Sequence, residues 1–123
     1  SGILAAHGGN AQFMVPEPRE SVIRAAAFHD CGWYTYETRP IYDLARKSPP
    51  NFPQAPLDAA QLAAFQGGLD WLWGIDPYAG LLISRHRTGL WRHRYGAVAW
   101  PSPPPARVLT PEVEAFIAEY KTP

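Results

Sequence analysis

Proline limits the folds open to this chain more than any other residue type does. It occupies 14 of the 123 positions, and inside a helix it removes a backbone hydrogen bond and clashes with the preceding turn. Most of the prolines are gathered in three stretches, at residues 16–18, 40–56 and 101–105. Hydrophobic patterning predicts an all-α, mostly helical fold, and the prolines predict that its short helices are joined by long proline-rich loops.

Hydrophobic spacing and stop signals predict where the first helices lie. A helix ending at His7 is expected first, because Gly8-Gly9 follows it, and the beginning of this helix is expected to be missing from the chain. A second helix over residues 20–30, stopped by Gly32, is apolar almost all round. We expect that second helix to be buried.

Three further helices are predicted by polar residues that precede a helical pattern, with proline at the first helical position in two of them. These starts are Asp58, Asp76-Pro77 and Thr110-Pro111. The helices are expected over residues 59–73 and 77–86 and from residue 111 onward. In the first of them, apolar residues recur every three or four positions and predict one buried face; they are Leu62, Phe65, Leu69 and Leu72.

Two segments carry weaker local signals. Residues 33–42 alternate aromatic and polar side chains, which favours one small β-hairpin, although Pro40 limits its length. Gly67-Gly68 weakens the helix over residues 59–73, and we expect this pair to mark a close crossing with another helix.

The amino-acid composition bounds the size and surroundings of the fold. With 46% hydrophobic and 18% charged residues, the chain can build one core, so a single domain over residues 1–123 is expected. The 11 basic and 11 acidic residues cancel, and we expect no nucleic-acid partner. The apolar stretches are shorter than the roughly 20 residues of a spanning helix, so no membrane partner is expected. The single cysteine, Cys31, fits a reducing compartment, and we expect a cytoplasmic location.

His29 and Asp30 are the first candidates for chemistry. They are adjacent near the end of a helix that is expected to be buried, and burying such a pair is costly unless both groups are satisfied. A divalent metal ion would satisfy both, because neutral imidazole and ionised carboxylate are its ordinary ligands. A hydrogen-bonded pair at a helix end explains the same dipeptide, so the residues alone leave both interpretations open.

Two further histidines are candidate metal ligands. His86 closes an apolar helix and would add a ligand from a separate element, although a partly exposed histidine in a basic run is an equal alternative. His7 stands at the end of the first helix, where a histidine also favours the helix dipole. His93 lies between two arginines and is expected to be solvated.

The arginines around His86 are the only concentration of charge in the chain. They are Arg85, Arg87, Arg92 and Arg94. If this cluster faces the His-Asp pair, Arg85 or Arg87 would bind a phosphate or carboxylate group, since guanidinium groups match such oxyanions. A solvated helix face is the alternative interpretation.

Aromatic side chains are candidates for a ligand pocket, although residues of this kind more often form core. They are Trp33, Tyr34, Tyr36, Trp71, Trp73 and Tyr78. Cys31 is not expected to act as a nucleophile, because no base with its own orienting group can be identified for it.

Two long motifs stand out in the sequence. Residues 27–33 read Ala-Phe-His-Asp-Cys-Gly-Trp, and residues 76–84 read Asp-Pro-Tyr-Ala-Gly-Leu-Leu-Ile-Ser, with His86 shortly after. Together with Thr88-Gly89-Leu90 and Arg94-Tyr95-Gly96, they resemble an uncharacterised bacterial family, the domain-of-unknown-function family numbered 3891. The resemblance implies that the chain lacks the natural N-terminal segment of that family.

The His-Asp pair of that family, set in an all-helical domain, is similar in turn to the HD superfamily of metal-dependent phosphohydrolases and, in a minority, di-iron oxygenases. This similarity implies an HD-domain-like bundle with a further histidine ligand upstream of the pair and an aspartate downstream. His7 lies upstream of the pair, and Asp70 and Asp76 lie downstream. His86 is a substitute for the downstream ligand.

The resemblance favours a metal-dependent hydrolase of a small phosphorylated or nucleotide-like substrate, with a divalent Fe, Mn, Zn or Mg ion. The expected ligands are His29, Asp30, His86 and His7, with Asp70 as an alternative to His7. Asp30, Arg85 and Arg87 are the expected catalytic residues, the arginines neutralising the leaving phosphate.

Two alternative functions remain open. An HD-type di-iron oxygenase would use the same ligands. A non-catalytic small-molecule binding or assembly domain would keep His29-Asp30 as a structural pair. The amphipathic final helix packs either in its own domain or against a second subunit, so a homo-oligomer is an open expectation.

Overall fold

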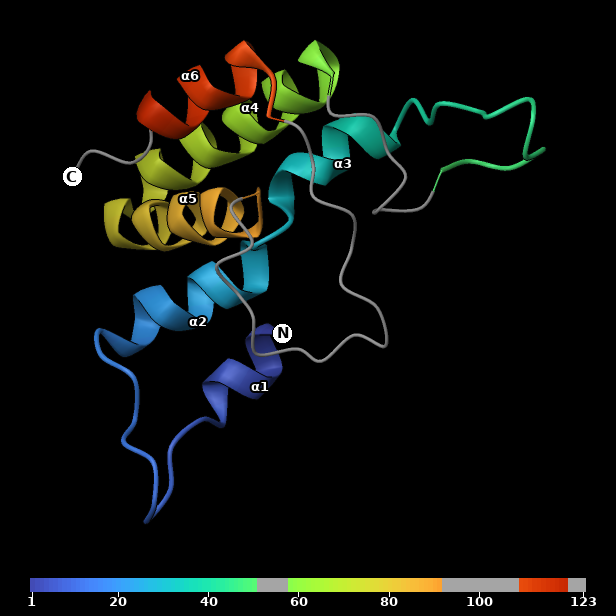
Figure 1. The fold of residues 1–123 in the computed structure, drawn as a ribbon. Helices are drawn as coiled ribbons and strands as arrows, with labels where there is room; N and C mark the ends of the chain where they lie inside the picture. The colour runs from blue at the N-terminus through green and yellow to red at the C-terminus, as the bar shows by residue number, and fades with distance from the viewer. Residues whose placement is uncertain (51–57, 92–108, 120–123) are drawn as a thin grey trace.

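In a computed structural model, residues 1–50, 58–91 and 109–119 are described, and this part of the chain is all α-helical (Figure 1). Its helices are α1 (Gly2–Ala6), α2 (Arg19–Phe28), α3 (Cys31–Glu37), α4 (Ala59–Ile75), α5 (Pro77–Trp91) and α6 (Pro111–Glu119). The expected all-α class is confirmed. The expected loops around Pro53, Pro56 and residues 101–105 lie outside the described residues.

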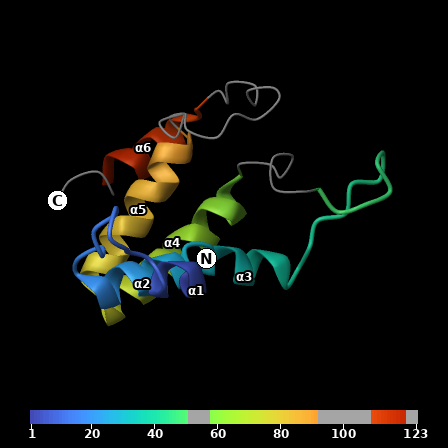
Figure 2. The ribbon, with the colours of Figure 1, turned by 90° about the horizontal axis from the view of Figure 1, so that it is seen from below.

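Helix α4 holds the bundle together, because it packs against α3, α5 and α6. Helix α2 packs against α5 on one side and against α1 on the other. Both ribbon views show residues 38–50 leaving the end of α3 and extending away from the helices (Figures 1 and 2). Helix α3 therefore lies between the bundle and this extended segment.

The helix starts predicted for α4 and α5 are confirmed. The Asp58 carboxylate accepts the backbone N–H of Gln61 at 2.8 Å, and that of Asp76 accepts the N–H of Ala79 at 3.0 Å. Each bond satisfies a donor that the first turn of a helix would leave unpaired. Both helices run further than expected, to Ile75 and Trp91.

The core lies where α4 meets α5 and α6. Its buried side chains are Ala25, Phe65, Leu69, Leu72, Ala79, Ile83, Val113, Phe116 and Ile117. The predicted apolar face of α4 is confirmed, with Leu62 half-buried at its edge. The apolar face of α6 is buried within this chain, and Tyr120, expected on that face, lies outside the described residues.

The segment around Gly32 differs from the sequence expectation. Gly32 does not stop a helix but lies within α3, and residues 33–37, expected in a hairpin, continue that helix. Within the described residues, the only β pairing is an isolated bridge between Asp43 and Ser48. The alternating pattern misled because Trp33 and Tyr36 meet at helical spacing, with their rings 5.4 Å apart.

The expected burial of the second helix was also wrong. In α2 only Ala25 is buried, and Phe28 is 41% exposed. Its small apolar residues allow α1 to approach closely, since a Cβ on Gly2 would lie 2.8 Å from the Cβ of Ala27. A run of alanines thus predicted close packing on one side rather than burial all round.

The expected close crossing at Gly67-Gly68 is confirmed at the second glycine. A Cβ on Gly68 would lie 2.6 Å from the backbone nitrogen of Gly32, closer than side chains approach, whereas a Cβ on Gly67 would meet nothing within 4 Å. Gly32 and Gly68 thus let the α3 and α4 backbones touch. This crossing sets the position of the α2–α3 junction.

The first helix ends as its sequence predicted. Helix α1 has His7 at its C-cap, and Gly9 follows with a φ of 98°. A positive φ of this size favours glycine, which explains the turn at this point. None of the helices in the described residues is long and apolar enough to cross a membrane.

Candidate functional site

His29 and Asp30 occupy the junction between α2 and α3. His29 ends α2 with helical backbone angles, and Asp30 precedes α3 with φ −113° and ψ 17°. This sparsely populated backbone region recurs at residues of active sites. The Asp30 side chain makes no capping hydrogen bond to α3. Its carboxylate is therefore free to face other side chains.

The Asp30 carboxylate connects two helices that are distant in sequence. Its Oδ2 lies 3.0 Å from Nε2 of His29, and its Oδ1 accepts a hydrogen bond from Nη2 of Arg87 at 3.4 Å. Nδ1 of His29 lies 3.0 Å from the Ala26 carbonyl oxygen. Both nitrogens of the His29 ring thus face oxygen acceptors, an arrangement that suits a proton on each nitrogen or a cation at Nε2.

Arg87 is the buried member of this cluster. Its side chain is only 6% exposed, and its guanidinium carbon lies 3.7 Å from the centre of the Phe65 ring. A guanidinium stacked on an aromatic face gains cation–π stabilisation that offsets part of its desolvation. The Asp30 carboxylate is thus paired with a buried guanidinium group. The alternative interpretation of the arginines as a solvated helix face does not apply to Arg87.

Sequence reasoning missed this positioning role, although a signal for it exists. Arg87 follows Ile83 by four positions, and Ile83 belongs to the core. Residues four apart share a helix face, so the spacing places Arg87 on the buried side of α5. Arg85, two positions earlier, is exposed.

The structure brings His86 next to the pair. The rings of His29 and His86 are 5.8 Å apart, centre to centre, and nearly perpendicular. Burial lowers the pKa of His86 below its usual value, and the positive charges of Arg87 and His29 lower it further, against a smaller opposing effect of Asp30. The neutral imidazole, able to accept a proton or to bind a metal, is therefore the favoured form of His86.

The remaining predicted ligands lie apart from this cluster. His7 is exposed, and its Nδ1 lies 2.9 Å from the carbonyl oxygen of Ile3 in its own helix. Asp70 is exposed on α4, and Asp76 caps α5. His93 lies outside the described residues.

The cluster offers a divalent ion two donors. The 3.0 Å between His29 Nε2 and Asp30 Oδ2 suits two ligands that are each about 2.1 Å from one ion. A carbonyl oxygen at Nδ1 is the usual way in which a metal-binding imidazole is oriented. Throughout the described part of the chain, no three His, Cys, Asp or Glu side chains lie close enough to hold an ion together. The pair thus fits an ion that takes its other ligands from water and substrate.

Cys31 adjoins the cluster, but its setting disfavours reactivity. Its thiol lies 3.3 Å from the Gly68 carbonyl oxygen, to which it donates. Burial raises the pKa of Cys31, with the negative charge of Asp30 adding to the effect. Because the thiolate is the reactive form, this environment agrees with the expectation that Cys31 is not a nucleophile.

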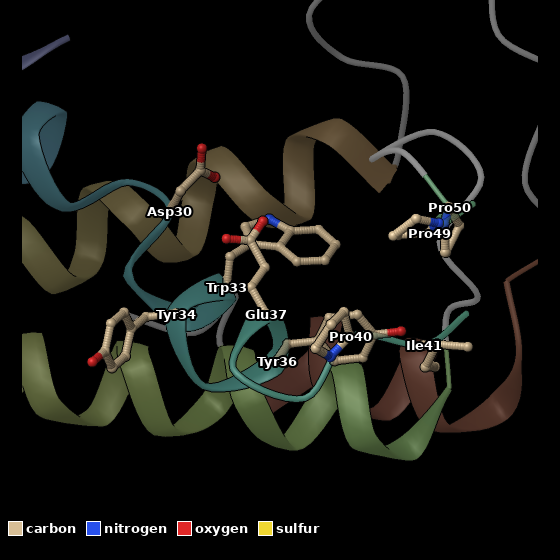
Figure 3. A pocket seen from close by; sticks show the side chains of 9 residues that line it. All are labelled: Asp30, Trp33, Tyr34, Tyr36, Glu37, Pro40, Ile41, Pro49 and Pro50. Carbon is tan, nitrogen blue, oxygen red and sulfur yellow. The ribbon is translucent and has the colours of Figure 1, made fainter. Parts of the chain in front are cut away.

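A cavity of about 510 Å³ opens beside Asp30, between α3 and residues 40–50 (Figure 3). It is lined by Asp30, Trp33, Tyr34, Tyr36, Glu37, Pro40, Ile41, Pro49 and Pro50. Three of the six aromatic candidates, those on α3, therefore line a pocket. The other three, Trp71, Trp73 and Tyr78, are exposed and not part of this lining.

Glu37 is the charged lining residue that sequence reasoning missed. It follows Trp33 by four positions on α3, a spacing that places the two on one helix face. Both side chains line the cavity (Figure 3). The expected hairpin concealed this relation, because a strand would have placed neither residue at helical spacing.

Comparison with known proteins assigns the chain to a family. The sequence model of the family described as "Protein of unknown function (DUF3891)" matches residues 1–123, so the chain belongs to that family. No curated protein and no solved structure matches it. The predicted membership is confirmed, whereas the similarity to the HD superfamily stays a prediction.

Proposed function

We propose that this member of the DUF3891 family hydrolyses a small phosphorylated or nucleotide-like substrate, with the reacting group held at the His29-Asp30 junction. The observation that carries the proposal is the meeting of three side chains. His29 and Asp30 at the α2–α3 junction lie next to His86 of α5, which follows His29 by 57 positions along the chain. Two imidazoles and a carboxylate at one partly open place are groups that bind metal ions and move protons.

A divalent ion fits this proposal as a partner recruited with the substrate. His29 Nε2 and Asp30 Oδ2 would supply two ligands, and water and phosphate oxygens would supply the rest. Mg²⁺ and Mn²⁺ are commonly bound in this way, through one or two protein ligands and substrate phosphates. The ion would supply charge neutralisation and water activation.

The remaining residues would act on orientation and protons. Arg87 donates to Oδ1 of Asp30 and leaves Oδ2 directed at His29, so it is a positioning residue rather than a phosphate ligand. The half-buried ring of His86 is a group that can accept a proton from the attacking water. Of the two candidate arginines, Arg85 is exposed on the same helix and would therefore be the one that binds the phosphate group.

Titration with Mn²⁺, with and without inorganic phosphate, tests the proposal. The unchanged protein should bind Mn²⁺ in at least one of these conditions, and His29→Ala and Asp30→Asn should each weaken binding by about ten-fold or more. His7→Ala is the matched control, because His7 bonds within its own helix, and it should bind like the unchanged protein. Absence of Mn²⁺ binding in both conditions would overturn the proposal.

One observation favours a second candidate, the non-catalytic binding domain. Both oxygens of Asp30 already have partners within the protein, His29 and Arg87. Such a network is satisfied without an ion, as a structural pair would be. This candidate predicts no Mn²⁺ binding and no Mn²⁺-dependent hydrolysis of p-nitrophenyl phosphate or its diester. A di-iron oxygenase needs more ligands than the described residues bring together, so the hydrolase is preferred to it.

A further inference from the structure

The cavity beside α3 has the dimensions of a small-molecule site. Its volume of about 510 Å³ lies within the roughly 300–1,000 Å³ that such sites usually occupy. Asp30 forms one end of the lining, and the remaining lining residues belong to α3 and to the segment that follows it. The cavity therefore extends from the junction into a region that the proposed hydrolysis does not explain.

One wall of the cavity is aromatic and fixed in place. The Trp33 ring is perpendicular to the core ring of Phe65, with centres 5.0 Å apart. The Tyr36 ring packs edge-to-face against Trp33 at 5.4 Å. Aromatic faces carry partial negative charge and attract cations, and rings that are already ordered lose little entropy on binding.

The charged groups of the lining are both carboxylates. Asp30 is shared between His29 and Arg87. Glu37 forms no hydrogen bond or ion pair with any side chain of the described segments, and no lysine, arginine or histidine is among the described lining residues. The Arg87 guanidinium lies 5.9 Å from the centre of the Trp33 ring, but it is paired with Asp30. The charge of Glu37 would repel an anionic ligand and attract a cation.

Apolar side chains and one buried hydroxyl group complete the lining. Pro40, Ile41, Pro49 and Pro50 present apolar surface (Figure 3). The Tyr36 hydroxyl is shielded from solvent and lacks a hydrogen-bond partner among the residues that the structure describes. A buried hydroxyl left unpaired is costly, but because this oxygen is shielded it is not offered to a ligand in the cavity.

We propose that this cavity binds an organic ammonium ion carried on an apolar ring or chain. The ammonium group would lie between the Glu37 carboxylate and the Trp33 ring, which are four positions apart on α3 and both line the cavity (Figure 3). The apolar part would lie against the proline wall. The inference concerns binding alone and holds whether or not the neighbouring junction catalyses hydrolysis.

Benzylammonium and benzyl alcohol test this inference, because they share size and ring and differ in charge. Their binding can be followed through the indole N–H resonance of Trp33, identified by its loss in a Trp33→Phe variant. Benzylammonium should bind at least about ten-fold more tightly than benzyl alcohol. Glu37→Gln should weaken benzylammonium roughly three- to ten-fold and leave the alcohol unchanged.

Glu20→Gln is the matched control, since Glu20 is exposed in the first turn of α2 and outside the lining. It should leave the affinity for benzylammonium unchanged. Equal affinity for the two probes, no effect of Glu37→Gln in a folded protein, or no saturable shift of Trp33 below about 10 mM would each overturn the proposal. No metal ion is added, so failure here leaves the Mn²⁺ result independent.

Discussion

Two aspartate–arginine pairs of this protein have opposite burial. In the pair of Arg24 and Asp76, the arginine side chain is 37% exposed and the aspartate only 9%. In the pair of Arg87 and Asp30, the arginine is 6% exposed and the aspartate 54%. Each pair links a residue of α5 or its cap to the α2–α3 region. The two pairs therefore connect the same parts of the fold, but in one the aspartate is buried and in the other the arginine.

Whether the aspartate or the arginine is the buried member of the pair determines what the aspartate can do. Asp76 accepts the N–H of Ala79 and hydrogen bonds from Ser21 and Arg24, and these bonds lower its pKa, led by the backbone bond to Ala79. That carboxylate is committed to the helix start. Asp30 makes no such cap, and its supporting cation is below the surface, so its carboxylate faces outward beside the cavity. An exposed carboxylate on a buried guanidinium is suited to meeting a ligand.

Of the variants considered, Gly68→Ala should have the largest effect on stability, because it acts on the contact between α3 and α4. The added Cβ would overlap the Gly32 backbone, 2.6 Å from its nitrogen, and displace α3 together with Asp30. We expect a loss of about 3 kcal/mol or more in the free energy of unfolding by urea. Gly67→Ala meets open space and should instead stabilise by about 0.5–1 kcal/mol. Equal effects of the two variants would contradict the close crossing.

Arg87→Ala tests the buried guanidinium. Removing a side chain that stacks on Phe65 leaves a gap in the core, and we expect a loss of roughly 2 kcal/mol in unfolding free energy together with weaker Mn²⁺ binding. Arg24→Ala should destabilise less, because its side chain is partly solvated, and should leave Mn²⁺ binding unchanged. The reverse order of stability in matched urea titrations would refute the assignment.

Asp76→Asn tests the committed carboxylate through pH. Its pKa in the folded protein is lowered, so its charge stabilises the fold fully above its unfolded value of about 3.9 and less as the pH falls through the folded value. At pH 7 we expect Asp76→Asn to lower Tm by roughly 5 °C. This difference should shrink as the pH is lowered below about 3.9. A difference in Tm that is constant across this range would exclude the charge effect.

Asp30→Asn should have the smallest effect on stability. The side chain is more than half exposed, and surface substitutions of this kind usually change the unfolding free energy by no more than about 0.5 kcal/mol. The same variant should weaken Mn²⁺ binding by about ten-fold or more, which separates a functional carboxylate from a structural one. A large loss of stability in thermal or urea unfolding would instead make Asp30 a structural partner of Arg87.

The comparison also explains how much the sequence could predict. Asp58 and Asp76 act on the first turn of their own helices, so short-range patterns predicted both starts correctly. Gly32 was misjudged because its role is tertiary, in the contact with Gly68. A glycine that stops a helix and one that admits another helix have the same local signature.

The candidate site was predicted to a similar extent. His29, Asp30 and His86 were proposed from their motifs and do lie together. The burial of Arg87 could have been inferred from its spacing to Ile83, but its contact with Phe65, 22 positions earlier in the chain, is one that no local pattern contains. The cavity likewise depends on how residues 40–50 face α3, which is a property of the folded chain.

The absence of any residue between His29 and Asp30 has a mechanical consequence. The imidazole moves with α2 and the carboxylate with α3, and α2 is attached to α1 and α5 whereas α3 is attached to α4. A rotation of one helix against the other therefore acts directly on the distance between Nε2 and Oδ2. The angle between two helices is thus converted, at a single peptide bond, into the spacing of two reactive groups.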